Sequence, residues 1–348
     1  MSCIADILTL FASPYGDHLA TLPNYTNEFV SILEISGAQI PQEYVSSSCS
    51  DEDLSDAHSW LIKYTQENFF ARKGERWETT VPEWIHTNSD YIFEKSSHFI
   101  NFFISEKAPD QNDDCVAILG ATRKESEQRI DNTIKLVAEG QVKPDAVYLL
   151  TGQRFLQPKE LSNSETAEIA KTTGKEESLT EADMMSFLYK SKTGTDATLV
   201  DATACNLPLD SEEKCSRSRP NTEDTLEAFL AMDQTCQRIA FVSRAPNTYA
   251  QAEAVAHIMK ALSPETKFEV IGGSADPREL PAHMKFHALH HILMPFAGAL
   301  WGSFERISTE IAVKLEQCPA EYEYLNSLKE SIKSEKIAKG SEFTLKLP

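Results

Sequence analysis

The amino-acid sequence predicts an α/β protein in which a mainly parallel sheet carries helices on both faces. Between residues 115 and 275, short apolar runs alternate with amphipathic segments of helical length. Glycines follow several of these runs, as expected where strands end in turns. Strands that alternate with helices are joined by crossover connections, and crossover connections make a sheet parallel.

The expected elements follow one another in a regular order. The apolar runs predict strands at residues 115–119, 145–150, 197–200, 238–243 and 267–271. Helical spacing of apolar residues predicts the connecting helices at residues 123–139, 180–190, 221–233 and 247–262. Gly140 is suited to stop the first of these helices, and Thr180 is suited to cap the second. This order is typical of a Rossmann-like sheet.

The flanking regions have helical rather than alternating patterns. We expect a helical N-terminal region at residues 1–108, an α/β ligand-binding domain at 109–275, and a helical C-terminal region at 276–348 that packs on the core. The polar segment at residues 107–114, which contains a proline, is a natural boundary. Helices are expected at residues 51–73, in part of 84–104, and from about 280 to 338.

Composition and charge limit the classes of partner. The chain of 348 residues is 41% hydrophobic and 25% charged, which is typical of a globular protein with a real core. Its formal net charge is −20, and its lysines and arginines are dispersed, so we expect no nucleic-acid partner. No apolar run approaches the ~20 residues of a membrane-spanning helix, so we also expect no membrane span.

The cysteines and the first residues bear on location. The seven cysteines form no CxxC pair and their number is odd, which favours reduced thiols over a disulfide framework. The first residues lack a basic segment, and Asp6 interrupts their apolar stretch, so a cleaved signal peptide is not expected. We therefore expect a cytoplasmic protein.

In an open parallel sheet, ligands bind beyond the carboxyl ends of the strands, where helix N-termini attract anions. Candidate ligand-binding residues at these positions are Gly120, Thr122, Thr151, Gly152, Arg154, Asn221, Thr222 and Ser243. The glycines would allow close approach of the backbone, and the hydroxyl and amide groups would hydrogen-bond the ligand. The candidate catalytic residues are Glu181 and Asp224, which could orient a ribose hydroxyl or accept a proton.

Each of these residues also has a structural interpretation. The glycines could simply end strands, Asn221-Thr222 could be a helix cap, and Glu181 could complement a helix dipole. Arg129 would offer charge but lies far enough along its helix to be structural instead. The GxGxxG, GxxxxGK[ST] and GxSxG motifs are absent, and Cys205 and Cys215 have no base nearby in the sequence.

An ordered series of short motifs runs through residues 115–275, about half of the chain. It consists of Leu119-Gly120, Arg129, Thr151-Gly152, Thr180-Glu181-Ala182, Asn221-Thr222 and Val242-Ser243. This series resembles the SanA/ElyC/YdcF family, also called domain of unknown function 218. The chain departs from the family pattern at Ala121 and Gln153, where the family has glycines. It also lacks the His and Arg that follow the last strand motif, with Asn247 and Gln251 nearby instead.

The resemblance implies a Rossmann-type fold of nucleotide-using enzymes. At least one family member is thought to bind S-adenosylmethionine, and others are linked to the integrity of the bacterial envelope. On this basis S-adenosylmethionine is the best single candidate for a cofactor, and a transferase is favoured over an oxidoreductase. If the absent His and Arg matter for the family's chemistry, this chain binds the same class of ligand but reacts differently or not at all.

A group of histidines is the second candidate site. His283, His287 and His290 fall within about 60° of one another on a helix, and three imidazoles on one face could bind a metal. The alternative is that Met284, Leu289 and Ile292 make the buried side while the histidines flank it. Without a carboxylate at fixed spacing, the sequence favours this alternative, so we expect no metal. One of these histidines could also reach the sheet and act as a general acid or base.

Three functions therefore remain open. The first is an enzyme that binds a nucleotide-like or anionic small molecule at the strand ends. The second is a hydrolase of a phosphorylated or other anionic substrate. The third is a non-catalytic binding or regulatory protein whose pocket has degenerated and whose helical extensions contact a protein partner.

Overall fold

The computed structural model describes most of the chain in two compact units. It covers residues 2–12, 22–70, 80–104, 113–156, 160–175, 178–202, 220–232, 236–245, 247–272 and 282–314. Unit 1 consists of Met1–Ser105 and Ser274–Pro348, and unit 2 of Glu106–Gly273. The two helical regions that the sequence predicts at the ends of the chain thus belong to one unit.

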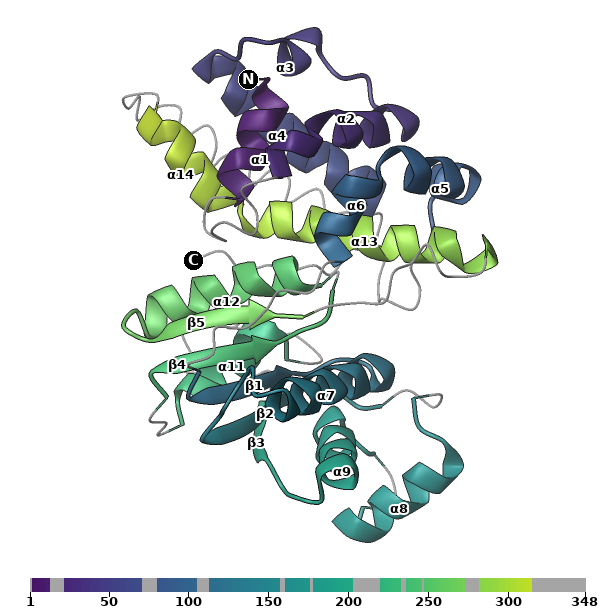
Figure 1. The fold of residues 1–348 in the computed structure, drawn as a ribbon, viewed down its shortest axis with the longest axis vertical. Helices are drawn as coiled ribbons and strands as arrows, with labels where there is room; N and C mark the ends of the chain where they lie inside the picture. The colour runs from purple at the N-terminus through teal and green to yellow at the C-terminus, as the bar shows by residue number, and fades with distance from the viewer. Residues whose placement is uncertain are drawn as a thin grey trace. The chain divides into compact units, whose positions relative to one another are not determined.

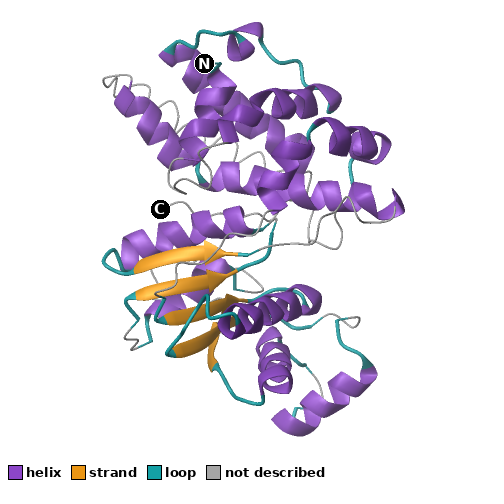
Figure 2. Cartoon of the chain, in the orientation of Figure 1, coloured by secondary structure: helices purple, strands orange, loops and turns teal. Residues whose placement is uncertain are grey.

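Unit 2 contains a five-stranded parallel sheet (Figures 1 and 2). Its strands are β1 (Cys115–Leu119), β2 (Ala146–Gly152), β3 (Thr198–Ala202), β4 (Arg238–Val242) and β5 (Lys267–Ile271). Their order in the sheet is β3-β2-β1-β4-β5, and every neighbouring pair is parallel. The α/β class and the five strands expected from the apolar runs are therefore confirmed.

Two pairs of helices cover the sheet. The helices α7 (Arg123–Ala138) and α9 (Glu181–Thr193) pack against each other, and α11 (Thr222–Leu230) packs against α12 (Thr248–Leu262). Val116 and Ile118 of β1 share a buried cluster with Ile130 of α7 and Met184 of α9. Alternate strand residues meet the other pair, where Phe229 of α11 packs on Phe241 of β4. The helix α8 (Asn163–Thr173) precedes α9 and was not predicted.

The direction of the crossovers reverses beside β1. From β1 the chain passes to β2 and then to β3 at one edge, and it returns to β4 on the other side of β1. Leu119 of β1 is in register with Leu150 of β2, and Ile118 with Val242 of β4. The carboxyl ends of β1 and β4 are therefore adjacent, and this is the topological switch point of the sheet.

Unit 1 is a group of helices around an aromatic core. The rings of Phe29, Phe99 and Phe296 contact one another with centroids 5.0–5.4 Å apart. The helices are α1 (Cys3–Ala12), η2 (Leu22–Tyr25), α2 (Thr26–Ile35), α3 (Gln42–Val45), α4 (Asp51–Thr65), the π-helix η3 (Gln66–Phe70), α5 (Glu83–Lys95), α6 (Ser97–Ile104), α13 (Ala282–Gly302) and α14 (Phe304–Lys314). Among the described helices, none has the length and apolar content needed to cross a bilayer.

The helix α14 packs against α1 and α4 within unit 1. The Arg306 side chain donates hydrogen bonds to the carbonyls of Leu10 and Phe11, the last turn of α1, at 2.7 and 3.2 Å. The His58 ring of α4 is fully buried and stacks on Phe304, with centroids 5.3 Å apart. Burial, with a smaller effect from Arg306, lowers the pKa of His58 to about 3. A neutral imidazole therefore serves here as an apolar packing element.

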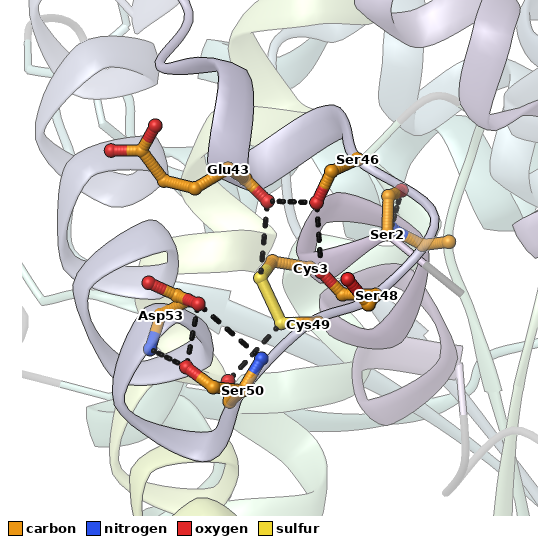
Figure 3. Close-up of a disulfide and its surroundings, with 9 residues drawn as sticks. Ser2, Cys3, Glu43, Ser46, Ser48, Cys49, Ser50 and Asp53 are labelled. Carbon is orange, nitrogen blue, oxygen red and sulfur yellow. Dashed lines mark hydrogen bonds between the residues drawn. A yellow bond between two sulfur atoms is a disulfide. The ribbon is translucent and has the colours of Figure 1, made fainter.

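Two disulfides overturn the expectation of reduced thiols for four of the seven cysteines. Cys3 at the start of α1 is joined to Cys49, which precedes the capping box formed by Ser50 and Asp53 at the start of α4 (Figure 3). Cys115 of β1 is joined to Cys236, just ahead of β4. The prediction was wrong because it looked for local CxxC spacing, whereas these partners are 46 and 121 residues apart.

Candidate functional site

The switch point lies between the N-termini of α7 and α12. The chain enters α7 from β1 through Thr122 and enters α12 from β4 through Asn247, and neither side chain caps its helix. By contrast, α8, α9 and α11 each begin with a complete capping box. Asn247 Nδ2 reaches Glu125 Oε1 of α7 at 3.4 Å, so the first turns of α7 and α12 are close together. At the start of α7 the Arg123 N–H already donates to Glu160 Oε1 at 3.3 Å, whereas the positive end of the α12 dipole is suitable for an anion.

A buried carboxylate lies against the backbone where β1 ends. A Cβ atom at Gly120 would collide with Glu181 Oε1 and would lie 2.8 Å from the Leu150 carbonyl. The glycine is therefore needed at this position to admit the Glu181 side chain. Glu181 is the first residue of α9, and its N–H bonds the carbonyl of Arg154 at 2.9 Å.

Arg154 links two acidic residues. Its Nε donates to Glu181 Oε2 at 2.9 Å, and its Nη1 donates to Glu160 Oε2 at 2.7 Å. Burial lowers the pKa of Arg154, but the two carboxylates outweigh burial and raise it above its usual value. Burial also raises the pKa of Glu181, an effect that Arg154 and Arg129 oppose. Glu181 is thus a rim acid whose neutral form is favoured by burial, while Arg154 is already bonded to two carboxylates.

Arg129 holds the end of β1 rather than facing solvent. Its side chain is buried, and Nη1 donates to the carbonyls of Leu119 and Gly120 at 2.6 and 2.9 Å. These bonds fix the backbone on which Glu181 rests. The structural interpretation of Arg129 is therefore supported.

The candidates after β2 are largely used within the fold. The Thr151 hydroxyl is buried and donates to the Val200 carbonyl of β3 at 3.0 Å. A Cβ atom at Gly152 would collide with the Pro220 ring, so Gly152 admits the residue that precedes α11. Both residues shape the rim without offering a free polar group.

Asn221 and Asp224 form the capping box of α11. Asn221 Oδ1 accepts the Asp224 N–H at 2.9 Å, and Asp224 Oδ2 accepts the Asn221 N–H at 2.8 Å. The Thr222 carbonyl accepts the Thr225 hydroxyl within the first turn. This is the helix-cap arrangement that the sequence offered as the alternative to ligand binding.

The loop after β4 carries an arginine next to the candidate Ser243. The Ser243 hydroxyl donates to Gln251 Oε1, and the Ser243 N–H bonds the Ile271 carbonyl at 2.8 Å. Arg244 follows directly and is half-buried. Burial lowers the pKa of its guanidinium, and the Glu125 carboxylate opposes this. The sequence signal was its position directly after a predicted strand. At the start of α7, Thr122 is exposed, with its hydroxyl 3.4 Å from Glu125 Oε2.

The structure thus brings Gly120, Glu181 and Arg154 into one charged cluster beside β1. Gly152 lies beside the capping box of α11, and Ser243 lies beside α12. The predicted residues follow one rim of the sheet but fall into separate groups: Gly120, Glu181 and Arg154 contact one another, and Asn221 and Asp224 bond each other at the start of α11.

The histidine group belongs to unit 1. His283 lies in α13, but its side chain is outside the described residues. His287 is exposed, whereas His290 is buried, and burial lowers its pKa to about 4. Within the described side chains there is no group of three metal-ligating residues. The triad itself is untested, and Cys205 and Cys215 also lie outside the described residues.

No family model matches this chain, and no curated protein or solved structure shows significant similarity to it. The resemblance to the SanA/ElyC/YdcF family therefore stays a prediction from its motifs. The geometry of the rim is therefore the evidence for the function of this chain.

Proposed function

We propose that unit 2 binds a small anionic, nucleotide-like molecule at the carboxyl ends of its parallel strands. The observation that carries this proposal is the switch point between β1 and β4, flanked by the N-termini of α7 and α12. Open α/β sheets bind ligands at such a point. S-adenosylmethionine is the best single candidate, and the corresponding activity is that of a transferase.

Glu181 is the proposed functional acid of this site. Its carboxylate is held at the end of β1 by the missing side chain of Gly120 and by the Arg154 guanidinium. A carboxylate at the carboxyl end of a central parallel strand can accept hydrogen bonds from ribose hydroxyls or take a proton from a substrate.

Calorimetric titration with S-adenosylmethionine and with ATP tests the proposal. Wild-type protein should bind one of them, and Glu181→Gln should weaken that binding about tenfold, because bonds to a charged acceptor contribute about 1.5–3 kcal/mol. Glu168→Gln, an exposed position on α8, is the control with the same change of charge. Equal affinity of Glu181→Gln and wild type would remove Glu181 from the site, and no binding of either ligand would refute the proposal.

A second function, a binding or regulatory protein without turnover, is favoured by one observation. Both predicted catalytic acids already have internal partners, since Glu181 bonds Arg154 and Asp224 bonds Asn221. In this alternative the site senses a ligand, and unit 1 contacts a protein partner. Ligand binding without methyl transfer or hydrolysis in a product assay would support it over an enzyme.

The cytoplasmic location is a separate proposal that can be tested through the cysteines. Disulfides persist in oxidising compartments and are rare in the cytosol. Counting free thiols by mass spectrometry in protein trapped with alkylating agent directly from cells decides the matter. Free thiols at Cys115 and Cys236 in that sample would support a cytoplasmic location, and a disulfide between them would contradict it.

A further inference from the structure

The start of α12 has features that the predicted site did not include. The helix has 15 residues and begins where β4 and β5 end. Asn247 precedes it in helical conformation and makes no side-chain cap. The helix therefore begins without the capping box that starts α8, α9 and α11.

Thr248, the first residue of α12, carries a buried hydroxyl without a partner. The residue is only 6% exposed, and its Oγ1 makes no hydrogen bond with any residue that the structure describes. The group faces the end of β5, because a Cβ atom built on Gly272 would lie 3.0 Å from Thr248 Oγ1 and 2.8 Å from the Ser243 carbonyl. Buried polar groups are nearly always bonded, so an unbonded hydroxyl at a helix N-terminus indicates a missing ligand atom.

Arg244 provides a cation on the loop that leads into α12, where its carbonyl accepts the Asn247 N–H at 2.8 Å. Other arginines of the rim are bonded within the protein: Arg123 to Glu127 and Glu165, and Arg154 to Glu160 and Glu181. The guanidinium of Arg244 makes no hydrogen bond or ion pair with any described residue, although it is half-buried. The Glu125 carboxylate interacts electrostatically with the Arg244 guanidinium. A partly desolvated guanidinium is a favourable partner for an oxyanion, which it can bind with two parallel hydrogen bonds.

We propose that an oxyanion group binds at the start of α12, held by the Arg244 guanidinium, the Thr248 hydroxyl and the positive end of the α12 dipole. The inference rests on the proposed function and identifies where the charged group of that ligand lies. The same chemistry fits the phosphate of a nucleotide, free phosphate, and the carboxylate of S-adenosylmethionine. The chain has a formal net charge of −20, so anion binding here requires a built site and not general attraction.

Titration with inorganic phosphate, AMP and S-adenosylmethionine separates these sources. In the wild type, at least one of the three should bind. Arg244→Gln should raise its Kd about tenfold or more, because a charge-assisted bidentate contact is lost. Lys260→Gln, exposed in the last turn of the same helix, removes the same charge at the other end and should leave Kd within about twofold. Glu125→Gln should tighten binding, because it removes the nearest negative charge.

Thr248→Val distinguishes a ligand contact from a structural one. Valine has nearly the same shape but no hydroxyl, so the melting temperature should stay the same or rise if Thr248 Oγ1 has no internal partner. Anion affinity should fall about threefold to tenfold, as expected for one neutral hydrogen bond. A lower melting temperature with unchanged affinity would assign the hydroxyl to the fold and overturn its part in the site.

Arginine modification gives a second readout. Phenylglyoxal followed by peptide mapping should modify Arg244 faster than Arg129 or Arg154, and the bound anion should protect it. If AMP or S-adenosylmethionine binds wild type and Arg244→Gln equally, this inference is wrong while the proposed function stands. If none of the three compounds binds, both are wrong.

Discussion

Removing the disulfide between Cys115 and Cys236 should strongly destabilise unit 2. The bond ties the start of β1 to the residue two positions ahead of β4, its neighbour in the sheet. It closes a loop with a sequence separation of 121 residues. The loop-entropy relation gives about 5 kcal/mol for a loop of this length, the upper end of what native disulfides contribute. Because whole domains have about 5–15 kcal/mol of stability, this is a large share.

The double variant Cys115→Ala with Cys236→Ala measures this contribution without leaving a free thiol. Urea unfolding followed by far-UV circular dichroism should show a lower midpoint than the oxidised wild type. The matched control is Cys3→Ala with Cys49→Ala, which removes the disulfide that spans 46 residues in unit 1. This variant should lower the free energy of unfolding by about 4 kcal/mol. Adding reductant to the wild type should reproduce both losses together.

One result would refute the reasoning. If non-reducing peptide mapping of oxidised protein shows no Cys115–Cys236 linkage, or if the variant unfolds at the wild-type midpoint with and without reductant, the bond does not stabilise the sheet. The odd count of cysteines would then have been the better guide.

Three further predictions concern single side chains. His58→Leu should reduce the acid sensitivity of unit 1, measured by urea unfolding at a series of pH values. The imidazole pKa is lowered to about 3 in the folded state. The free energy of unfolding of the wild type should therefore fall as the pH drops below about 6.5, by up to about 5 kcal/mol near pH 3, and the variant should lack this loss. Gly120→Ala should lower the free energy of unfolding by about 1–3 kcal/mol, measured by thermal unfolding, because its Cβ collides with Glu181. An unchanged melting temperature would mean that Glu181 does not lie on Gly120. Asn221→Ala should lower the free energy of unfolding in urea by about 1 kcal/mol, because it removes the N-cap of α11. If the free energy of ligand binding falls by more than the free energy of unfolding, Asn221 binds the ligand instead.

The strands could be predicted because each is a short apolar run that the sheet buries. All five residues of β1 are buried, and its predicted bounds, 115–119, are those observed. Thr180 could be predicted as an N-cap because its side chain needs only the local N–H of Asp183. Local signals of this kind do not depend on the rest of the fold.

The features that escaped prediction depend on residues far apart in the chain. α8 has one buried residue, Ile169, so it shows almost no apolar periodicity. The role of Arg154 depends on Glu160 and Glu181, which surround it only in the folded state. Near the end of α7, Leu136 is buried whereas the neighbouring Val137 is 43% exposed, and apolar character alone does not tell the two apart.

The candidate site was predictable in outline and not in detail. Parallel strands place Gly120 and Ser243 on one rim, and that followed from the alternation of elements alone. Which polar groups are available to a ligand could not be known, because Asn221 and Asp224 bond each other, whereas the Thr248 hydroxyl and the Arg244 guanidinium have no hydrogen-bond partner among the described residues. The sequence shows where a rim lies, and the folded contacts decide which of its groups are left for a ligand.

Hydrogen exchange with and without ligand tests whether the switch point is the binding site. Amide exchange read by mass spectrometry, in the presence of AMP or S-adenosylmethionine, should slow in residues 120–126 and 243–250, where α7 and α12 begin. Peptides at the opposite end of the sheet, residues 140–146 and 236–239, should be unchanged. Protection confined to the opposite end, or to the helices of unit 1, would contradict a ligand site between β1 and β4.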